Sequence, residues 1–332
     1  MEYWLPIIFV GLMALAIIVY GILDGYDLGV GILLPFSQQE ELARDKMIAS
    51  IGPFWDANET WLVLAIGILL IAFPEAHSIV MYHTYIPLVI MLLGLIIRGV
   101  AFDFRAKAAT DHKLTWDRAF KVGSLLTSFM QGYMLGMFVM GFEQDFQALI
   151  FCFLSGLGVT AAYTYIGACW LVWKTEANLQ QRAIYWAKWA GRLTLLGVIL
   201  VCNVNLLVNP DVFNRWFEYP LVMFVLLIPT TCFTLFIFND RLLARLPKPE
   251  DRYASVPLLL AALIFLMCFI GLGFSFFPEV IPGQLTIWQA ASATESLAFI
   301  LVGAAVVIPT IIGYTAFSYW VFRGKTTDLQ YH

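Results

Sequence analysis

The sequence is poor in charge. Only 13% of its 332 residues are Asp, Glu, Lys or Arg, whereas 61% are hydrophobic; ordinary soluble domains carry about 25% charged residues. This composition excludes a water-soluble globular protein and indicates an integral membrane protein. The formal net charge of −4 says little about partners, because the position of each charge relative to the membrane matters more than the sum.

Cysteine is also scarce, and no two cysteines have the CxxC spacing. The five cysteines all fall inside apolar stretches, where we interpret them as small buried hydrophobes and not as a disulfide framework or a metal site; they are Cys152, Cys169, Cys202, Cys232 and Cys268. A GxGxxG motif, a P-loop and a cluster with metal-ligand spacing are absent from the sequence. The chain is therefore expected to bind no nucleotide and no metal.

Histidine, the usual haem ligand, occurs only four times, at positions 77, 83, 112 and 332. No two of these are placed to face each other across neighbouring helices, as a bis-histidine haem demands. His83, one to two turns into an apolar segment, is a weak candidate for a ligand. We expect the chain to bind no cofactor by itself and to handle protons rather than electrons.

Long hydrophobic segments are abundant. Apolar stretches of about 20 residues predict a transmembrane helix, and nine are found, approximately at 6–36, 50–73, 78–98, 119–141, 147–173, 192–209, 219–239, 255–277 and 294–322. The first lacks a basic n-region and a cleavage site, so we interpret it as retained and not as a signal peptide. The fold class predicted is an all-α polytopic membrane protein, a single domain over residues 1–332, with two four-helix bundles and one peripheral helix.

The basic residues predict the orientation. When the predicted loops are numbered alternately, 18 of the 19 Lys and Arg fall on one side of the membrane and only Arg215 on the other. Positive charge is retained in the cytoplasm. The N-terminus is therefore expected outside and the C-terminus in the cytoplasm.

Acidic residues interrupt the first two predicted helices. Residues 22–36 read ILDGYDLGVGILLPF, which places Asp24 and Asp27 within an apolar run; a carboxylate at the bilayer centre costs at least about 2.5–3.5 kcal/mol. The second helix begins SIGPFWDANETWLVL, where Asp56 and Glu59 have the same spacing and share a helix face. Two carboxylates this close are not expected to ionise together readily in a low dielectric.

The third helix ends RGVAFDFRAKA. It adds Asp103, with Arg105 nearby and Lys107 four residues on, in the favourable order for an ion pair. The predicted topology carries the acids of all three helices to one side of the membrane. They define a candidate proton path that opens to the cytoplasm.

A structural interpretation of the same residues stays open. Gly21, Gly25 and Gly29 form a ladder of small residues that would let another helix pack closely, and Asp24 would then cap or cross-link that contact. Asp56 is equally consistent with a first-turn acid stabilised by the helix dipole, and Asp103 with a simple ion pair.

The three motifs DGYDLGVG, FWDANETWLVL and LIIRGVAFDFRAKA, in this order, resemble subunit II of the cytochrome bd-type quinol oxidases, most of all the cyanide-insensitive branch. The resemblance implies a supporting role, in packing and interface hydrogen bonds, for residues that match the motifs: Trp55, Asn58, Trp61, Arg98 and Arg105. It implies that Asp56 is the best proton-path residue, with Asp103 and Lys107 nearer the mouth of the path.

The resemblance also implies partners. Subunit I would carry two b-type haems, a haem d or a third b-type haem, and the quinol site, while this chain would be its haem-free companion in the bacterial cytoplasmic (inner) membrane. A small single-helix accessory subunit and membrane lipid are further expected partners. The complex would oxidise quinol and reduce O₂ to water, taking the protons for water from the cytoplasm.

The sequence departs from the family pattern at two positions. Gln289, in TIWQAASATES, stands where relatives carry an acid, and Glu59 stands where part of the family has glutamine. Two alternatives remain. A secondary transporter also has intramembrane acids and glycine-rich helices, although the second half of the chain has no equivalent of DGYDLG; a purely structural assembly subunit is the other.

Overall fold

The chain folds almost entirely into long helices; the computed structural model describes residues 2–107 and 112–326. Within those residues, nine membrane-length apolar segments confirm the predicted number: α1 (Trp4–Leu33), α3 (Trp55–Ala72), α4 (Pro74–Lys107), α5 (Lys113–Val139), α6 (Phe146–Lys174), α7 (Ala177–Val208), α9 with α10 (Val222–Val225 and Leu227–Leu243), α11 (Val256–Phe276) and α13 (Thr294–Val321).

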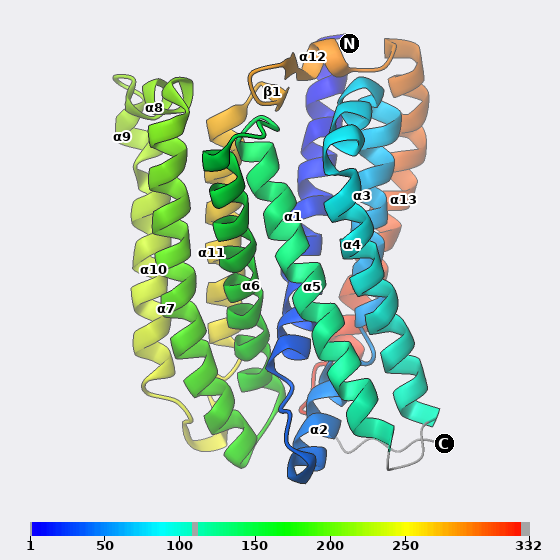
Figure 1. Cartoon of the computed structure of the whole chain (residues 1–332), viewed down its shortest axis with the longest axis vertical. Helices are drawn as coiled ribbons and strands as arrows, with labels where there is room; N and C mark the ends of the chain where they lie inside the picture. Colours follow the sequence, from blue (N-terminus) through cyan, green and yellow to red (C-terminus); the bar gives the residue numbers. More distant parts are fainter. Residues whose placement is uncertain (1, 108–111, 327–332) are drawn as a thin grey trace.

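Short elements connect these helices: η1 (Gln38–Glu40), α2 (Glu41–Ile51), α8 (Pro210–Phe217), η3 (Pro249–Asp251), the hairpin of β1 (Glu279–Ile281) and β2 (Leu285–Thr286), and α12 (Ile287–Ala290). In Figure 1 the hairpin and α12 lie at the end of the molecule where α1 begins, and α2 lies at the opposite end. We call the end that carries α2 the inner end and the other the outer end.

The long helices form two groups. Helices α1, α3, α4 and α5 pack against one another, and α6, α7, α10 and α11 form a second group. The two groups meet where α1 and α5 pack on α6. α13 lies beside α1 near α3 and α4, on the side of the molecule away from α7 and α10 (Figure 1). Only 11% of its most apolar stretch is buried, as expected of a peripheral helix.

Two predicted helix limits move substantially. The helix expected at 192–209 begins at residue 177, because its first turns are amphipathic: Leu179, Ala183 and Ile184 are buried in the core while their neighbours are polar. A window of mean hydropathy does not register such turns. The segment expected at 50–73 is interrupted at Pro53, between the end of α2 and the start of α3, because proline has no backbone N–H to donate to the helix ladder. Gly52, the residue before it, keeps helical dihedral angles.

Two glycines let α1 and α6 approach closely. A Cβ on Gly29 would lie 1.8 Å from the carbonyl oxygen of Tyr163, and one on Gly167 would lie 2.5 Å from the backbone of Gly29. Gly25 similarly lies against the Tyr163 ring, whereas a Cβ on Gly21 would have no neighbour within 4 Å. Of the three glycines of α1 that were expected to form a close helix contact, only Gly25 and Gly29 do so, and the partner helix is α6.

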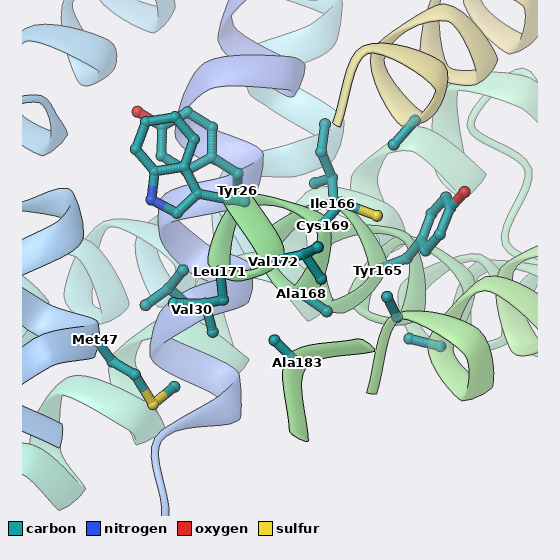
Figure 2. Packing of buried hydrophobic residues seen from close by; sticks show 14 of the residues in the cluster. Tyr26, Val30, Met47, Tyr165, Ile166, Ala168, Cys169, Leu171, Val172 and Ala183 are labelled. Atoms are coloured by element: carbon teal, nitrogen blue, oxygen red, sulfur yellow. The ribbon is translucent and has the colours of Figure 1, made fainter. Parts of the chain in front are cut away.

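The largest hydrophobic core surrounds the inner half of α6. Figure 2 shows Val30 of α1 and Met47 of α2 beside Leu171 and Val172 of α6. Trp170 is fully buried and stacks on Tyr26 of α1, with ring centroids 4.0 Å apart. Because α2 closes this core from the inner end, it fixes α1, α3 and α6 around the polar residues described next.

Candidate functional site

Five polar residues meet inside the first helix group, and we call them the buried polar cluster: Asp24, Asp27, Asn58, Glu59 and Arg98. They come from α1, α3 and α4. All but Glu59 are at most 1% exposed, and the Glu59 side chain is 26% exposed. Asp24 precedes the end of α1 by nine residues, which places the cluster about 14 Å from that end.

Arg98 is the centre of the cluster. Its Nη1 atom donates to Asp24 Oδ1 at 2.9 Å and to Glu59 Oε1 at 2.8 Å. Its guanidinium also lies 5.7 Å from the centre of the Trp55 ring and 5.6 Å from that of Phe120. A single cation therefore joins three helices and is enclosed by aromatic rings.

The cluster has more acid than base, and its hydrogen bonds are incomplete. The cluster holds three carboxylates and one guanidinium: Asp24 and Glu59 pair with Arg98, and Asp27 accepts a hydrogen bond from Asn58. Among the described residues, Asp24 Oδ2, Asp27 Oδ1, and Arg98 Nε and Nη2 are buried without a hydrogen-bond partner. Buried polar atoms are nearly always paired, with protein or with water. Four orphaned atoms in one place are therefore typical of a functional polar site.

Asn58 connects the cluster to buried tyrosines. Its Nδ2 donates to Asp27 Oδ2 at 2.6 Å and to the Tyr26 hydroxyl at 3.1 Å. The Tyr319 hydroxyl donates to Asn58 Oδ1 at 3.3 Å and lies 2.5 Å from the Tyr26 hydroxyl. Through this chain of contacts, α13 reaches the cluster.

A second polar chain lies on the outer side of Asp24. Tyr20, one helical turn before Asp24, accepts a hydrogen bond from Gln131 Nε2 at 2.5 Å. Tyr163 donates to Gln131 Oε1 at 2.8 Å. These three side chains belong to α1, α5 and α6, so hydrogen-bonding groups continue from the cluster between the two helix groups.

A different set of charges lies toward the inner end, the inner ion-pair network of Arg44, Asp45, Arg105 and Asp117. Asp117 accepts from Arg44 Nε at 2.7 Å and from Arg105 Nε at 2.5 Å. Arg105 Nη2 also pairs with Asp45 at 2.5 Å, and Arg44 donates to the Ser37 carbonyl. The network joins α2, α4 and α5.

The structure brings together some predicted site residues and leaves others at the surface. Asp24, Asp27, Glu59, Asn58 and Arg98 converge as described. Asp56, Asp103 and Lys107 are exposed on this chain, and Arg105 joins the inner network instead. Asp103 thus lies on a face of α4 that points outward, whereas Ala101 and Arg105, two residues to either side, are buried.

The two tryptophans of the motif FWDANETWLVL lie in different surroundings. Trp55 is half-buried and packs on Phe102 with ring centroids 4.9 Å apart, while Trp61 is 2% exposed in a small core with Tyr20. Sequence reasoning missed Tyr20, Tyr26, Tyr163, Tyr319, Gln131 and the acids of the inner network. Tyrosine and glutamine within helices carry no distinctive signal, and Asp117 stands in a segment where charge is expected.

Comparisons with known proteins decide the family. The model of the family "Cytochrome bd terminal oxidase subunit II" matches residues 5–322. The chain belongs to this family. It is 31% identical to cytochrome bd ubiquinol oxidase subunit 2 of Bacillus subtilis over 96% of each chain. It is 27% identical to cytochrome bd-I ubiquinol oxidase subunit 2 of Escherichia coli K12, covering 95% of this chain and 93% of that one.

A solved structure shares the fold. The bd oxidase from Geobacillus thermodenitrificans contains a chain that superposes with a TM-score of 0.74 at 20% identity, covering 97% of this chain and 99% of that chain. Together with the family match, this confirms the resemblance to subunit II of the cytochrome bd-type oxidases. The chain is a subunit of an oxidoreductase complex of the cytochrome bd type, multi-pass in the bacterial inner membrane, and subunit I is its implied partner.

Haem, which the family's complexes require, does not fit the described histidines as a bis-histidine ligand pair. His77 and His83 lie six residues apart on one helix, α4, so they cannot face each other across a haem. The His83 ring is stacked on Phe142, with centroids 4.9 Å apart. His112 stands at the start of α5, toward the inner end.

Proposed function

We propose that this chain is the haem-free subunit of a quinol:O₂ oxidoreductase, and that its buried polar cluster carries protons from the cytoplasm toward the oxygen-reducing haem of subunit I. The names of the relatives support quinol as the electron donor. In this proposal the b-type haems, the haem d or further b-type haem, and the quinol site belong to subunit I. The observation that carries the proton role is a buried cluster that holds three carboxylates and only one guanidinium.

The excess of acid gives the cluster its capacity to hold protons. If all three carboxylates were ionised, Arg98 would leave two negative charges uncompensated in a site that is almost fully buried. Such a state is strongly disfavoured in a low dielectric. The cluster is therefore suited to hold a proton, and each orphaned carboxylate oxygen is an acceptor for a neighbouring donor or water.

The exposed acids support an opening of the route at the inner end of α3. Asp56 is exposed at the inner end of α3, and Glu59, one turn further in, is partly exposed while bonded to Arg98. Asp56 and Glu59 thus connect the chain's surface to the interior of the cluster. Because acids facing lipid are costly, we infer that subunit I covers the face of α3 and α13, and that protons pass at this interface.

The proposed orientation follows from the basic residues, which gather toward the inner end. We propose that this end is cytoplasmic and the outer end extracytoplasmic, as the charge bias of the loops predicts. Protons consumed in water formation would then come from the side where Asp56, Asp103 and Lys107 lie. A small accessory subunit, and membership of the cyanide-insensitive branch, are further parts of this proposal that rest on the motif resemblance.

A structural role is the second candidate, and one observation favours it. Arg98 bonds to α1 and α3 from α4, so the cluster also fastens three helices together. A subunit with only this role would support the assembly of subunit I without moving protons.

Asp56→Asn separates the two candidates. Asp56 makes no hydrogen bond or ion pair with the described part of the chain, so its substitution should leave the fold intact. We expect turnover, measured as quinol-dependent O₂ consumption by the purified complex, to fall at least about tenfold, with an unchanged haem content per complex. Glu143→Gln, which removes another exposed acid, near the outer end of α5, is the matched control and should retain full turnover.

Unchanged turnover in Asp56→Asn, at normal haem content, would reject the proton role and leave the structural one. A reduced-minus-oxidised absorption spectrum tests whether the haems belong to subunit I and not to this chain. The complex purified through a tag on this chain should show b-type and d-type haem bands. Haem bands in the chain produced without subunit I would contradict a haem-free subunit.

A further inference from the structure

A groove between α7 and α10 lies apart from the site described above. It encloses about 230 Å³ and is lined by side chains from both helices and by Tyr165 of α6. Helices α7 and α10 lie on the opposite side of the molecule from α3, α4 and α13 (Figure 1). The groove therefore faces away from the surface that we assign to subunit I, toward membrane lipid.

The groove carries an excess of positive charge. Lys188, Arg192 and Arg241 line it together with a single acid, Asp240. Arg192 pairs with Asp240 at 3.3 Å across the two helices. Lys188 and Arg241 have no carboxylate at ion-pair distance among the residues that the structure describes. Two cations thus remain available to an anion that enters the groove.

The surroundings place the groove at the boundary between lipid and water. Arg241 lies in the last turn of α10, and the exposed aromatic residues Tyr185 and Trp189 lie on α7 at the same end of the groove. Aromatic side chains of this kind are enriched at membrane interfaces. In the other direction along the helices, toward the middle of the membrane, the groove is lined by Leu195 and Ile237, which suit an acyl chain.

A buried hydroxyl adds a hydrogen-bond donor to the wall. Tyr165 lines the groove, and its hydroxyl accepts from Asn239 Nδ2 at 2.5 Å. Its own proton is therefore free to be donated. Gly191 preserves this arrangement, because a Cβ there would lie 2.9 Å from Cε2 of the Tyr165 ring.

We propose that this groove binds one acidic phospholipid of the inner-end leaflet, with its phosphate between Lys188 and Arg241 and an acyl chain along Leu195 and Ile237. Basic pockets between transmembrane helices at the cytoplasmic side are suited to anionic headgroups. An apolar floor with two unpaired cations at its mouth matches such a lipid in both charge and shape. A soluble anion would use only the cations.

The test compares arginines one turn apart. Native mass spectrometry of the intact complex, titrated with phosphatidylglycerol, measures the affinity of the most strongly bound lipid. We expect Arg241→Gln to weaken binding about fivefold, and Lys188→Gln with Arg241→Gln about thirtyfold. Arg245→Gln removes an exposed cation four residues further on that does not line the groove, and should bind as the unmodified complex does. An equal loss in Arg245→Gln would overturn the proposal, as would full binding in the double variant.

Two further measurements test the shape of the site. Leu195→Trp fills the groove while keeping every charge, and should also abolish tight lipid binding; retained binding would exclude the groove as the site. Excess inorganic phosphate should leave the lipid bound, because the acyl chain anchors it. Displacement by phosphate would show a site for a simple anion instead. Unchanged O₂ consumption by each variant reports that the complex is correctly assembled.

Discussion

Two buried sets of charges in this protein use the same residue types in opposite proportions. The inner ion-pair network has two arginines and two aspartates, and no side-chain atom of these four residues is among the orphaned buried atoms of the described chain. The buried polar cluster has three carboxylates for one arginine, and four orphaned atoms. The first set is balanced and saturated, whereas the second is neither.

We interpret the balanced network as a contribution to stability and the unbalanced cluster as a functional site. A balanced network gains its energy only when every partner is present, so it fixes the inner ends of α2, α4 and α5. An unbalanced cluster cannot ionise completely and keeps acceptor atoms unused. In the function proposed above, it gains and loses protons without a change of fold, which a balanced network is not suited to do.

The largest expected effect is on the balanced network. Asp117→Asn leaves the guanidinium groups of Arg44 and Arg105 facing each other in a buried site without their shared carboxylate. We expect a loss of about 3–5 kcal/mol in stability, seen as a low yield of assembled complex and a lower midpoint of thermal unfolding.

The half-buried pair of Lys113 and Glu41, 3.2 Å apart, is the control for this loss. Glu41→Gln removes an ion pair at the same end of the molecule and should change stability by less than about 1 kcal/mol. If Asp117→Asn were equally mild, the network would not hold the inner ends of the helices together.

The second prediction concerns the unbalanced cluster. In Asp24→Asn, Glu59 still pairs with Arg98, so the stability change should stay at about 1–2 kcal/mol. Turnover should nevertheless fall at least about tenfold, because a proton-binding group is lost from the proposed route. O₂ consumption and thermal midpoint should be measured on one preparation. Asp24→Asn should lose turnover but keep most of its stability, whereas Asp117→Asn should lose stability. A large loss of stability in Asp24→Asn, with normal turnover per haem, would contradict the proton role of Asp24.

Glu59→Gln should have a smaller effect than Asp24→Asn. The amide oxygen of glutamine can still accept from Arg98, and Glu59 is partly exposed, so water can replace part of its function. We expect turnover to fall by less than about tenfold and the haem content to stay unchanged. Complete inactivation, measured in the same O₂ assay, would show that Glu59 is the obligatory link between Asp56 and the cluster.

The sequence predicts the helices better than their ends. Mean hydropathy reports burial in lipid, so all nine apolar segments were found. The first turns of α7 and most of α2 were missed, because they lie outside the apolar stretches and are held by contacts of a few residues such as Met47 and Leu179. These contacts join segments far apart in the chain, and no local pattern encodes them.

The site shows the same division. Asp24, Asp27 and Glu59 stand out because an acid in an apolar run needs an explanation. Arg98 was recognised only as part of a motif, and its place at the centre of the cluster depends on how α4 is rotated against α1. Asp103, five residues further along α4, is exposed for the same reason. Rotation of packed helices is a tertiary property that residue spacing alone does not determine.

The smallest expected effect comes from a balanced pair at the surface. Lys325, after α13, pairs with Asp251 at 2.8 Å, and Gln180 also donates to this carboxylate. Although partial burial acts to raise the pKa of Asp251, the hydrogen bonds from Lys325 and Gln180 outweigh it and lower the pKa below its usual value.

Because the pKa is lowered by folding, ionised Asp251 contributes stability above its unfolded pKa of about 3.9, and this contribution is lost as the pH falls through the lower, folded value. Asp251→Asn should therefore reduce the thermal midpoint of the complex by at most about 2 °C at pH 7. The difference from the unmodified complex should disappear in strong acid. A difference that persisted there would mean that the side chain contributes through packing instead of charge, and the contrast between balanced and unbalanced sites would then not extend to the surface.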